Sequence, residues 1–212
     1  MPVESVMKSA ADAGYHGVEV WGRDHIGDGS PEICREIVDQ ATELGLEIPV
    51  YGSYLRLGTT TFTDDVDHEL AIANHLGADK IRVWAGERGY DDCEPSHWEQ
   101  IVDDLNYTAA QARTDNIDVT VEKHANTVTD DPTGARSLIE AVDHDNVGLN
   151  WQPGFWLPPE DLVTEAQALA PLSNNIHVQA VPEPESRNRC PLADAYFPLE
   201  QLLEPFVDGS FD

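Results

Sequence analysis

Two patterns of apolar residues alternate along the chain. Apolar residues at helical spacing predict helices over residues 3–13, 31–44, 65–76, 97–114, 132–142, 159–169 and 197–206. Between them, short runs rich in β-branched and aromatic residues predict strands over residues 16–21, 46–51, 80–84, 117–122, 147–151 and 175–179. Strands and helices that alternate in this way are typical of a parallel sheet covered by helices.

The spacing of the predicted strands indicates a barrel. Each strand and its helix take roughly 25 to 35 residues, which suits a (β/α)8 barrel of about 250 residues. Such a barrel begins with a strand, whereas this sequence begins with a helix and stops where a closing strand is expected. We therefore expect a single domain over residues 1–212, a TIM-type α/β barrel with six strands that lacks the first and last strands. An open doubly wound sheet is the alternative, but it normally carries a glycine-rich loop, and residues 21–27 (WGRDHIG) do not match GxGxxG.

The charge of the chain is strongly acidic. Asp and Glu number 40 against 12 Lys and Arg, which gives a formal net charge of −28, while 41% of the residues are hydrophobic. This apolar content argues against disorder. Because the acids are spread over the predicted helices, we expect the solvated surface of a halophilic cytoplasmic protein; an acidic surface without adaptive meaning is the alternative. Such a surface repels phosphate backbones, so we expect no nucleic-acid partner.

Cysteine usage and hydropathy point to the same compartment. Cys34, Cys93 and Cys190 are widely spaced and form no CxxC pair, which indicates reduced thiols in a cytoplasmic protein. No apolar run approaches the roughly 20 residues that a membrane-spanning helix needs, and the N-terminus lacks the pattern of a signal peptide. We therefore expect no membrane association.

Polar side chains follow two neighbouring predicted strands. Glu122 and His124 lie at and beyond the end of strand 117–122, and Gln152 follows strand 147–151. In α/β folds ligands bind beyond the carboxyl ends of the strands, so these residues fall where an active site is expected. Glu122 and His124 are two residues apart, so they point to the same side of an extended chain. We take both as catalytic candidates; a rim carboxylate paired with a basic neighbour is the alternative for Glu122.

Aromatic and loop residues supply further binding candidates. Trp21, Trp84 and Trp151 each end a predicted strand and could wall a sugar site, although aromatic packing in the core explains them equally well. His25 lies in the loop after the strand 16–21 and could contact a substrate; a solvated loop is the alternative.

Arginines are rare in this sequence, so each one is informative. Arg82 alternates with apolar residues in strand 80–84 and could point into the barrel, where its charge needs an acidic partner such as Glu19 or Glu122. Arg187 and Arg189 follow a proline-rich loop and could bind an anionic group such as a sugar phosphate. Surface salt bridges are the alternative for these two.

Five segments in chain order resemble the xylose isomerase-like TIM barrels, a superfamily of sugar isomerases and epimerases that also contains the endonuclease IV fold. They are ADAGYHGVEVW (11–21), LGADKIRVWAG (76–86), VEKH (121–124), NVGLNWQPG (146–154) and IHV (176–178). The segments are short, but they cover almost the whole chain. The resemblance therefore supports the barrel more strongly than any single motif does.

The resemblance also implies a metal site. In that family a divalent ion is held in the barrel mouth by a Glu, an Asp, a His and a second Glu from late strands. Carried over, Glu122 is the first Glu and His177 the His, although a lone strand His is often a core residue. Gln152 stands at the Asp position, and the second Glu belongs to a strand that this sequence lacks. A neutral amide binds Mn, Mg or Zn less well than a carboxylate, so the metal site is expected to be weak.

The resemblance implies a sugar or sugar-phosphate isomerase or epimerase that transfers a proton through an enediolate. Glu122 would be the base, with His124, Gln152 and His177 binding the substrate or a weakly held ion. A non-catalytic barrel that binds a sugar or a partner is the alternative, since an incomplete barrel exposes sheet edges that could pair with another copy. An abasic-site nuclease resembling endonuclease IV is disfavoured by the acidic charge and the missing Asp.

Overall fold

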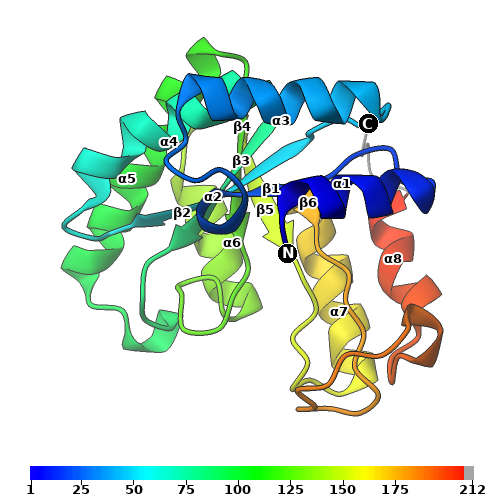
Figure 1. Ribbon diagram of the computed structural model, residues 1–212. Coiled ribbons are helices and arrows are strands. Elements are labelled where there is room, and N and C mark those ends of the chain that lie inside the picture. The colour runs from blue at the N-terminus through cyan, green and yellow to red at the C-terminus, as the bar shows by residue number, and fades with distance from the viewer. Residues whose placement is uncertain (208–212) are drawn as a thin grey trace.

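Six parallel strands form one sheet within residues 1–207, the part of the chain that the computed structural model describes (Figure 1). Each strand pairs with the next along the sequence, from the first to the last. The strands are β1 (Val20–Trp21), β2 (Val50–Leu57), β3 (Lys80–Ala85), β4 (Asp118–Glu122), β5 (Val147–Trp151) and β6 (Ser173–Ile176). The prediction of an α/β barrel with six parallel strands is confirmed.

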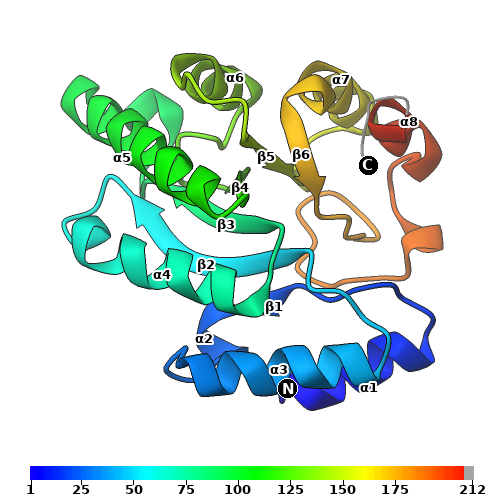
Figure 2. The same cartoon turned by 90° about the horizontal axis from the view of Figure 1, so that it is seen from above.

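Helices connect the strands and cover one face of the sheet (Figure 2). Proline at the first turn opens α3, α5, α6 and α7, and Gly77 ends α4 in a left-handed conformation with φ of 62°. The Asp131 side chain caps α6, because its Oδ1 accepts from the backbone N–H groups of Thr133 and Gly134. The helices are α1 (Val3–Asp12), α2 (Gly22–His25), α3 (Pro31–Glu43), α4 (Phe62–Leu76), α5 (Pro95–Thr114), α6 (Pro132–Ala141), α7 (Pro159–Leu169) and α8 (Leu199–Val207).

Alternation along the strands gives the sheet two unlike faces. Val83, Val119 and Leu149 are fully buried and belong to the apolar core between the sheet and the helices. The alternate positions, which face the barrel interior, carry polar side chains that are also buried, including Arg82 and Glu122. The centre of the barrel is therefore polar, and its charges need partners inside it.

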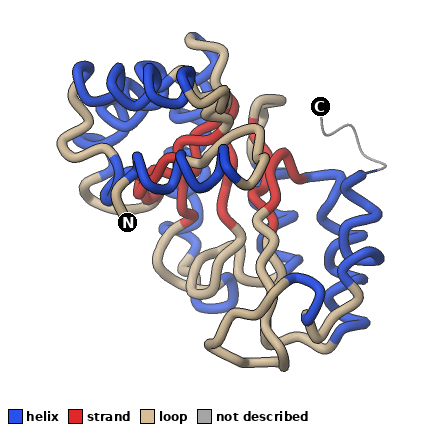
Figure 3. Tube along the Cα trace, turned by 45° about the vertical axis from the view of Figure 1, so that its right-hand side comes forward, coloured by secondary structure: helices blue, strands red, loops and turns tan. Residues whose placement is uncertain are grey.

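The sheet curves into an arc that leaves β1 and β6 unpaired with each other in the described part of the chain (Figure 2). Side chains span this opening: Glu19, just before β1, lies 2.7 Å from His177, just after β6. The loops that follow the strands gather at one end of the sheet (Figure 3). Among residues 1–207, no helix combines the length and apolar character that crossing a membrane requires.

Several elements differ from their predicted bounds. The first strand is shorter, with a separate bridge between Gly17 and Glu47, and β2 continues to Leu57 past an irregularity in its pairing with β3. The last strand runs from Ser173 to Ile176, because Ser173 already pairs with Leu149 of β5. Asn174 and Asn175 also donate side-chain hydrogen bonds to β4 and β5. A helical turn, α2, occupies the start of the loop expected after Trp21.

Candidate active site

A cavity of about 300 Å³ lies at the carboxyl ends of the strands. It collects side chains from most of the strand ends and from the loops that follow them, as expected for a barrel mouth. Its lining includes charged groups and large aromatic rings: Trp21, Tyr54, Arg82, Trp84, Glu122, Lys123, His124, Gln152, Phe155, Trp156, His177, Gln179 and Arg189. Among the residues proposed from sequence, the structure brings Trp21, Arg82, Trp84, Glu122, His124, Gln152 and His177 together here.

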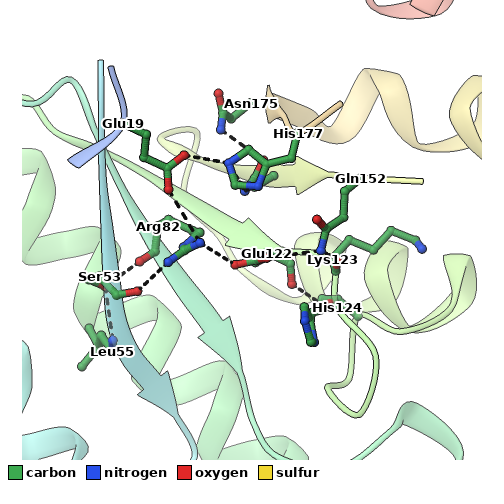
Figure 4. Close-up of polar contacts among 12 residues, drawn as sticks. Glu19, Ser53, Leu55, Arg82, Glu122, Lys123, His124, Gln152, Asn175 and His177 are labelled. Atoms are coloured by element: carbon green, nitrogen blue, oxygen red, sulfur yellow. Dashed lines mark hydrogen bonds and ion pairs between the residues drawn. The ribbon is translucent and has the colours of Figure 1, made fainter. Parts of the chain in front are cut away.

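Arg82 lies at the centre of the polar interior, between two carboxylates (Figure 4). Its Nη1 is 2.9 Å from Glu122 Oε2 and 3.6 Å from Glu19 Oε1, and its Nη2 donates to the Ser53 carbonyl at 3.2 Å. The residue is only 4% exposed. A charge so deeply buried needs opposite charges, and the two carboxylates expected from the sequence provide them.

Glu122 and Gln152 are joined at the ends of β4 and β5. The Gln152 amide nitrogen donates to Glu122 Oε1 at 3.2 Å and to the Lys123 carbonyl at 2.8 Å. With Arg82 on the other oxygen, both carboxylate oxygens of Glu122 face donors. These contacts fix the orientation of the carboxylate, as a general base requires.

His177 connects the opening of the barrel to β5. Its Nε2 is 2.7 Å from Glu19 Oε2, and Asn150 Nδ2 lies 3.2 Å from its Nδ1. Asn175 in turn donates to Asn150 Oδ1 at 3.1 Å. A continuous polar chain thus crosses the interior from β1 to β6, and its hydrogen bonds orient the imidazole.

Aromatic rings form part of the cavity wall. The rings of Trp84 and His124 are 4.4 Å apart between centroids, and the Arg56 guanidinium lies 4.7 Å from the Trp84 ring. His124 Nδ1 is 2.8 Å from the Ala125 carbonyl. Trp156, which is 48% exposed, stands at the rim. Flat rings beside hydrogen-bonding groups suit small polyhydroxylated ligands, whose faces are partly apolar.

The structure places three predicted binding residues elsewhere. Trp151 is fully buried and packs against Phe206 at 4.9 Å between ring centroids, because it alternates with Gln152 and so faces the helices. His25 stands outside the cavity lining, where its Nδ1 accepts from the Trp21 backbone N–H and burial lowers its pKa. Arg187 is also outside the lining.

Of the two arginines that could bind an anionic group, Arg189 lines the cavity and Arg187 does not. Arg189 Nε donates to Gln179 Oε1 at 2.5 Å, and its guanidinium lies 5.0 Å from the Phe155 ring centroid. Gln179, Phe155 and Tyr54 were missed in the sequence. The alternation of apolar and polar residues beyond Tyr51 could have extended β2 far enough to include Tyr54. Gln179 lies two residues after His177 in the predicted strand 175–179, so the same alternation could have placed it beside His177, whereas the loop of Phe155 carries no periodic signal.

A buried ion pair supports the site from the helical side. Lys123 follows Glu122 in sequence, so its side chain points away from the Glu122 carboxylate (Figure 4). Its Nζ is 3.1 Å from Glu165 Oε1, and both side chains are almost completely buried. Burial raises the pKa of Glu165 above its ordinary value, and the charge of Lys123 opposes that shift.

The residues present do not fit a divalent ion. Of the three positions that the family resemblance assigns to the metal, Gln152 presents a donor nitrogen to Glu122, and Glu122 is already paired with a guanidinium. His177 is hydrogen-bonded to Glu19. Within residues 1–207 there is no group of three or more His, Cys, Asp or Glu side chains that could hold a metal ion. Hard cations such as Mg or Mn need several anionic oxygens, which this arrangement does not supply.

The fold and the cavity define a TIM-type α/β barrel protein with a polar, aromatic-lined pocket at the strand ends. The chain belongs to the xylose isomerase-like TIM barrel family, whose model matches residues 7–209. It is 26% identical over 183 residues to the 3-dehydroshikimate dehydratase of Bacillus anthracis. That match covers 83% of this chain, and the chain spans 65% of the length of the relative.

Solved structures share the fold at low sequence identity. A probable 3-DHS dehydratase from Bacillus anthracis superposes with a TM-score of 0.81 at 21% identity, covering 97% of this chain and 84% of the other. A xylose isomerase-like TIM barrel protein from Mycobacterium smegmatis, in complex with magnesium, gives 0.76 at 18% identity over 98% and 78%. A D-psicose 3-epimerase solved in the presence of D-fructose gives 0.78 at 16% identity over 97% and 75%.

Proposed function

We propose that this protein is an enzyme that moves a proton beside the carbonyl of a small polyhydroxylated substrate, as a sugar or sugar-phosphate isomerase or epimerase. The observation that carries the proposal is the buried Glu122 carboxylate, 5% exposed, at the mouth of the barrel. Arg82 and Gln152 hold it in place. Its relatives include proteins named as a dehydratase and an epimerase, which supports an enzyme.

In the proposed reaction Glu122 takes a proton from the carbon next to the substrate carbonyl. The electrons of the broken C–H bond move into the carbonyl, and its oxygen becomes negative in the enediolate. Donors at that oxygen lower the barrier, and the Arg82 guanidinium is the nearest cation to Glu122. For an isomer, the proton of the neighbouring hydroxyl passes to this oxygen, and the carbon-bound proton returns to the former carbonyl carbon, so that the carbonyl forms at its neighbour. Delivery of a proton to the opposite face of the original carbon restores the first carbonyl and gives an epimer.

The remaining lining residues have binding roles in this proposal. His124 and His177 can exchange hydrogen bonds with substrate hydroxyls, and Trp21 and Trp84 can cover the apolar face of a sugar. Arg189, at the cavity edge, suits an anionic group such as a phosphate or carboxylate.

The free thiols of Cys34, Cys93 and Cys190 support a cytoplasmic location.

Deuterium exchange tests the proposal even while the product is unidentified. The protein is incubated in D2O with a panel of aldoses, ketoses and their phosphates, and substrate labelling is followed by NMR. We expect deuterium at the carbon beside the carbonyl for at least one compound, and a loss of at least about 10²-fold in Glu122→Gln. Glu99→Gln, an exposed change in α5, is the matched control. Labelling that is equal in Glu122→Gln would contradict the role of Glu122.

A dehydratase is the second candidate, favoured by the 26% identity to the 3-dehydroshikimate dehydratase. Loss of water from a β-hydroxy ketone begins with the same proton abstraction, after which hydroxide leaves the neighbouring carbon. Adding 3-dehydroshikimate to the panel separates the candidates, since a dehydratase yields a product lighter by one water. Compounds that stabilise the protein against heat without any exchange or dehydration would indicate a binding protein instead.

A further inference from the structure

A positively charged side chain, Arg82, lies beside Glu122, the residue that a divalent ion in this cavity would need as a ligand. Arg82 lies against Glu122 at 2.9 Å and against Glu19 at 3.6 Å. An arginine guanidinium is a fixed positive charge in proteins, and the Arg82 side chain is almost entirely buried. Glu122 therefore has a permanent cation as its partner, and a metal ion bound to Glu122 would lie close to a like charge inside a site of low dielectric.

The surroundings hold this cation in place. The Ser53 carbonyl accepts from Arg82 Nη2 at 3.2 Å, and the Ser53 hydroxyl donates to the Arg82 carbonyl at 2.5 Å. Ser53 and Arg82 thus lock β2 to β3 where the pairing of these strands is irregular. Arg82 also lines the cavity, so part of its donor capacity faces a ligand.

The side chain of Gln152 is compatible with an arginine beside Glu122. Its amide nitrogen donates to Glu122 and to the Lys123 carbonyl, which a carboxylate at this position could not do. An Asp there would instead add a third negative charge beside Glu19 and Glu122. The exchange of an acid for an amide is consistent with an arginine, and not a metal, as the cation of the site.

We propose that Arg82 supplies the positive charge beside Glu122 in place of a divalent ion, and that Gln152 adapts the site to it. The catalytic part of this inference rests on the proposed function: Arg82 would stabilise the enediolate oxygen without a metal. The charge arrangement itself is independent of any activity, so it can be tested on the protein alone.

Metal titration by thermal unfolding tests the charge arrangement. Protein treated with EDTA and dialysed into high salt is titrated with MnCl2 and, separately, MgCl2. We expect the wild type and Glu122→Gln to respond equally, because only the acidic surface then binds ions. A rise in Tm that the wild type shows and Glu122→Gln lacks would overturn the proposal. The double variant Arg82→Gln/Gln152→Asp, with the arginine removed and the acid restored, should gain an Mn-dependent rise in Tm; no gain would count against the proposal.

Deuterium exchange tests the catalytic part. EDTA should leave exchange by the wild type within about twofold, while Arg82→Gln should lose at least about tenfold and Arg82→Lys should retain more than Arg82→Gln. Loss of wild-type exchange in EDTA, with recovery on adding Mn, would overturn the inference. If no compound exchanges under any condition, the proposed function fails, and the metal titration still decides the charge arrangement.

Discussion

At the scale of single residues, the alternation of side chains at the end of β4 places an acidic and a basic residue on opposite faces of the sheet. Glu122 faces the cavity, whereas Lys123 turns to the helical layer and pairs with Glu165 in α7. A buried ion pair adds little net stability, since desolvation offsets the attraction, but removal of one partner leaves the other charge buried and alone. Lys123 therefore supports the strand end that carries Glu122.

Lys123→Met should lower the free energy of unfolding by about 3 to 5 kcal/mol near neutral pH, because Glu165 loses its cation. Urea denaturation in high salt measures the change. The double variant Lys123→Met/Glu165→Leu should recover most of the loss, since no charge then remains buried. A double variant as unstable as the single one would show that packing, and not charge, explains the effect.

The sequence predicts the cavity residues that lie at the strand ends better than those in the loops around them. Glu122, Gln152 and His177 could be placed because the ends of parallel strands converge on one side of a sheet. For Trp151 the sequence analysis leaves a sugar site and core packing open, although strict alternation from Gln152 already directs the side chain to the helices, where it is buried. Arg187 and Arg189 could not be separated, because the loop that holds them has no periodic pattern.

At the scale of elements, α4 packs on β2 through a buried polar contact. Tyr51 in β2 donates its hydroxyl to Glu69 Oε2 in α4 at 2.6 Å. Burial raises the pKa of Glu69 above its ordinary value of 4.5, and the hydrogen bond from Tyr51 opposes the shift. The folded protein thus holds the Glu69 proton more tightly than the unfolded chain, and this contribution to stability is lost as pH rises through the folded pKa.

Glu69→Gln should therefore be more stable than the wild type at pH 8 and should lose this advantage below about pH 4.5, where Glu69 is protonated in both states. The glutamine oxygen can still accept from Tyr51. Urea denaturation at several pH values measures the difference, with Glu99→Gln as a control for the loss of one surface charge. An advantage of equal size in the control would show that burial of Glu69 is not the cause.

The bounds of helices and strands are predicted well where the preferences of the residues agree with the packing of the fold. Long amphipathic helices such as α3 and α5 and the apolar strands β3, β4 and β5 lie close to their predicted bounds. The strand β6 begins earlier than predicted because the polar residues Ser173 and Asn175 pair with β5, and residue preferences do not reveal this tertiary pairing. The helical turn α2 is too short to show a period.

At the scale of the whole molecule, the net charge of −28 is the property that sets the response to salt. Carboxylates that repel one another across the surface disfavour the compact state. The halophilic and cytoplasmic assignments rest on this charge and on the free thiols, and they stay predictions.

Raising KCl from about 0.1 M to about 1 M should increase Tm, because the Debye length falls from about 10 Å to about 3 Å. Differential scanning calorimetry measures the rise, which should level off once screening is nearly complete. A Tm that is constant or falls over this range would mean that surface repulsion does not limit stability. A rise that stays linear well beyond 1 M would indicate salting-out instead of screening.

The contact between Glu19 and His177 joins parts of the chain 158 residues apart, whereas each strand pairs with its immediate successor. Sequential pairing closes short loops first, so the contact across the opening should form after the folding transition state. Glu19→Gln should then speed unfolding while leaving the refolding rate nearly unchanged in stopped-flow experiments. Slower refolding would instead place the meeting of the two sheet edges early in folding. If it is late, the cavity is completed only when the chain is otherwise folded.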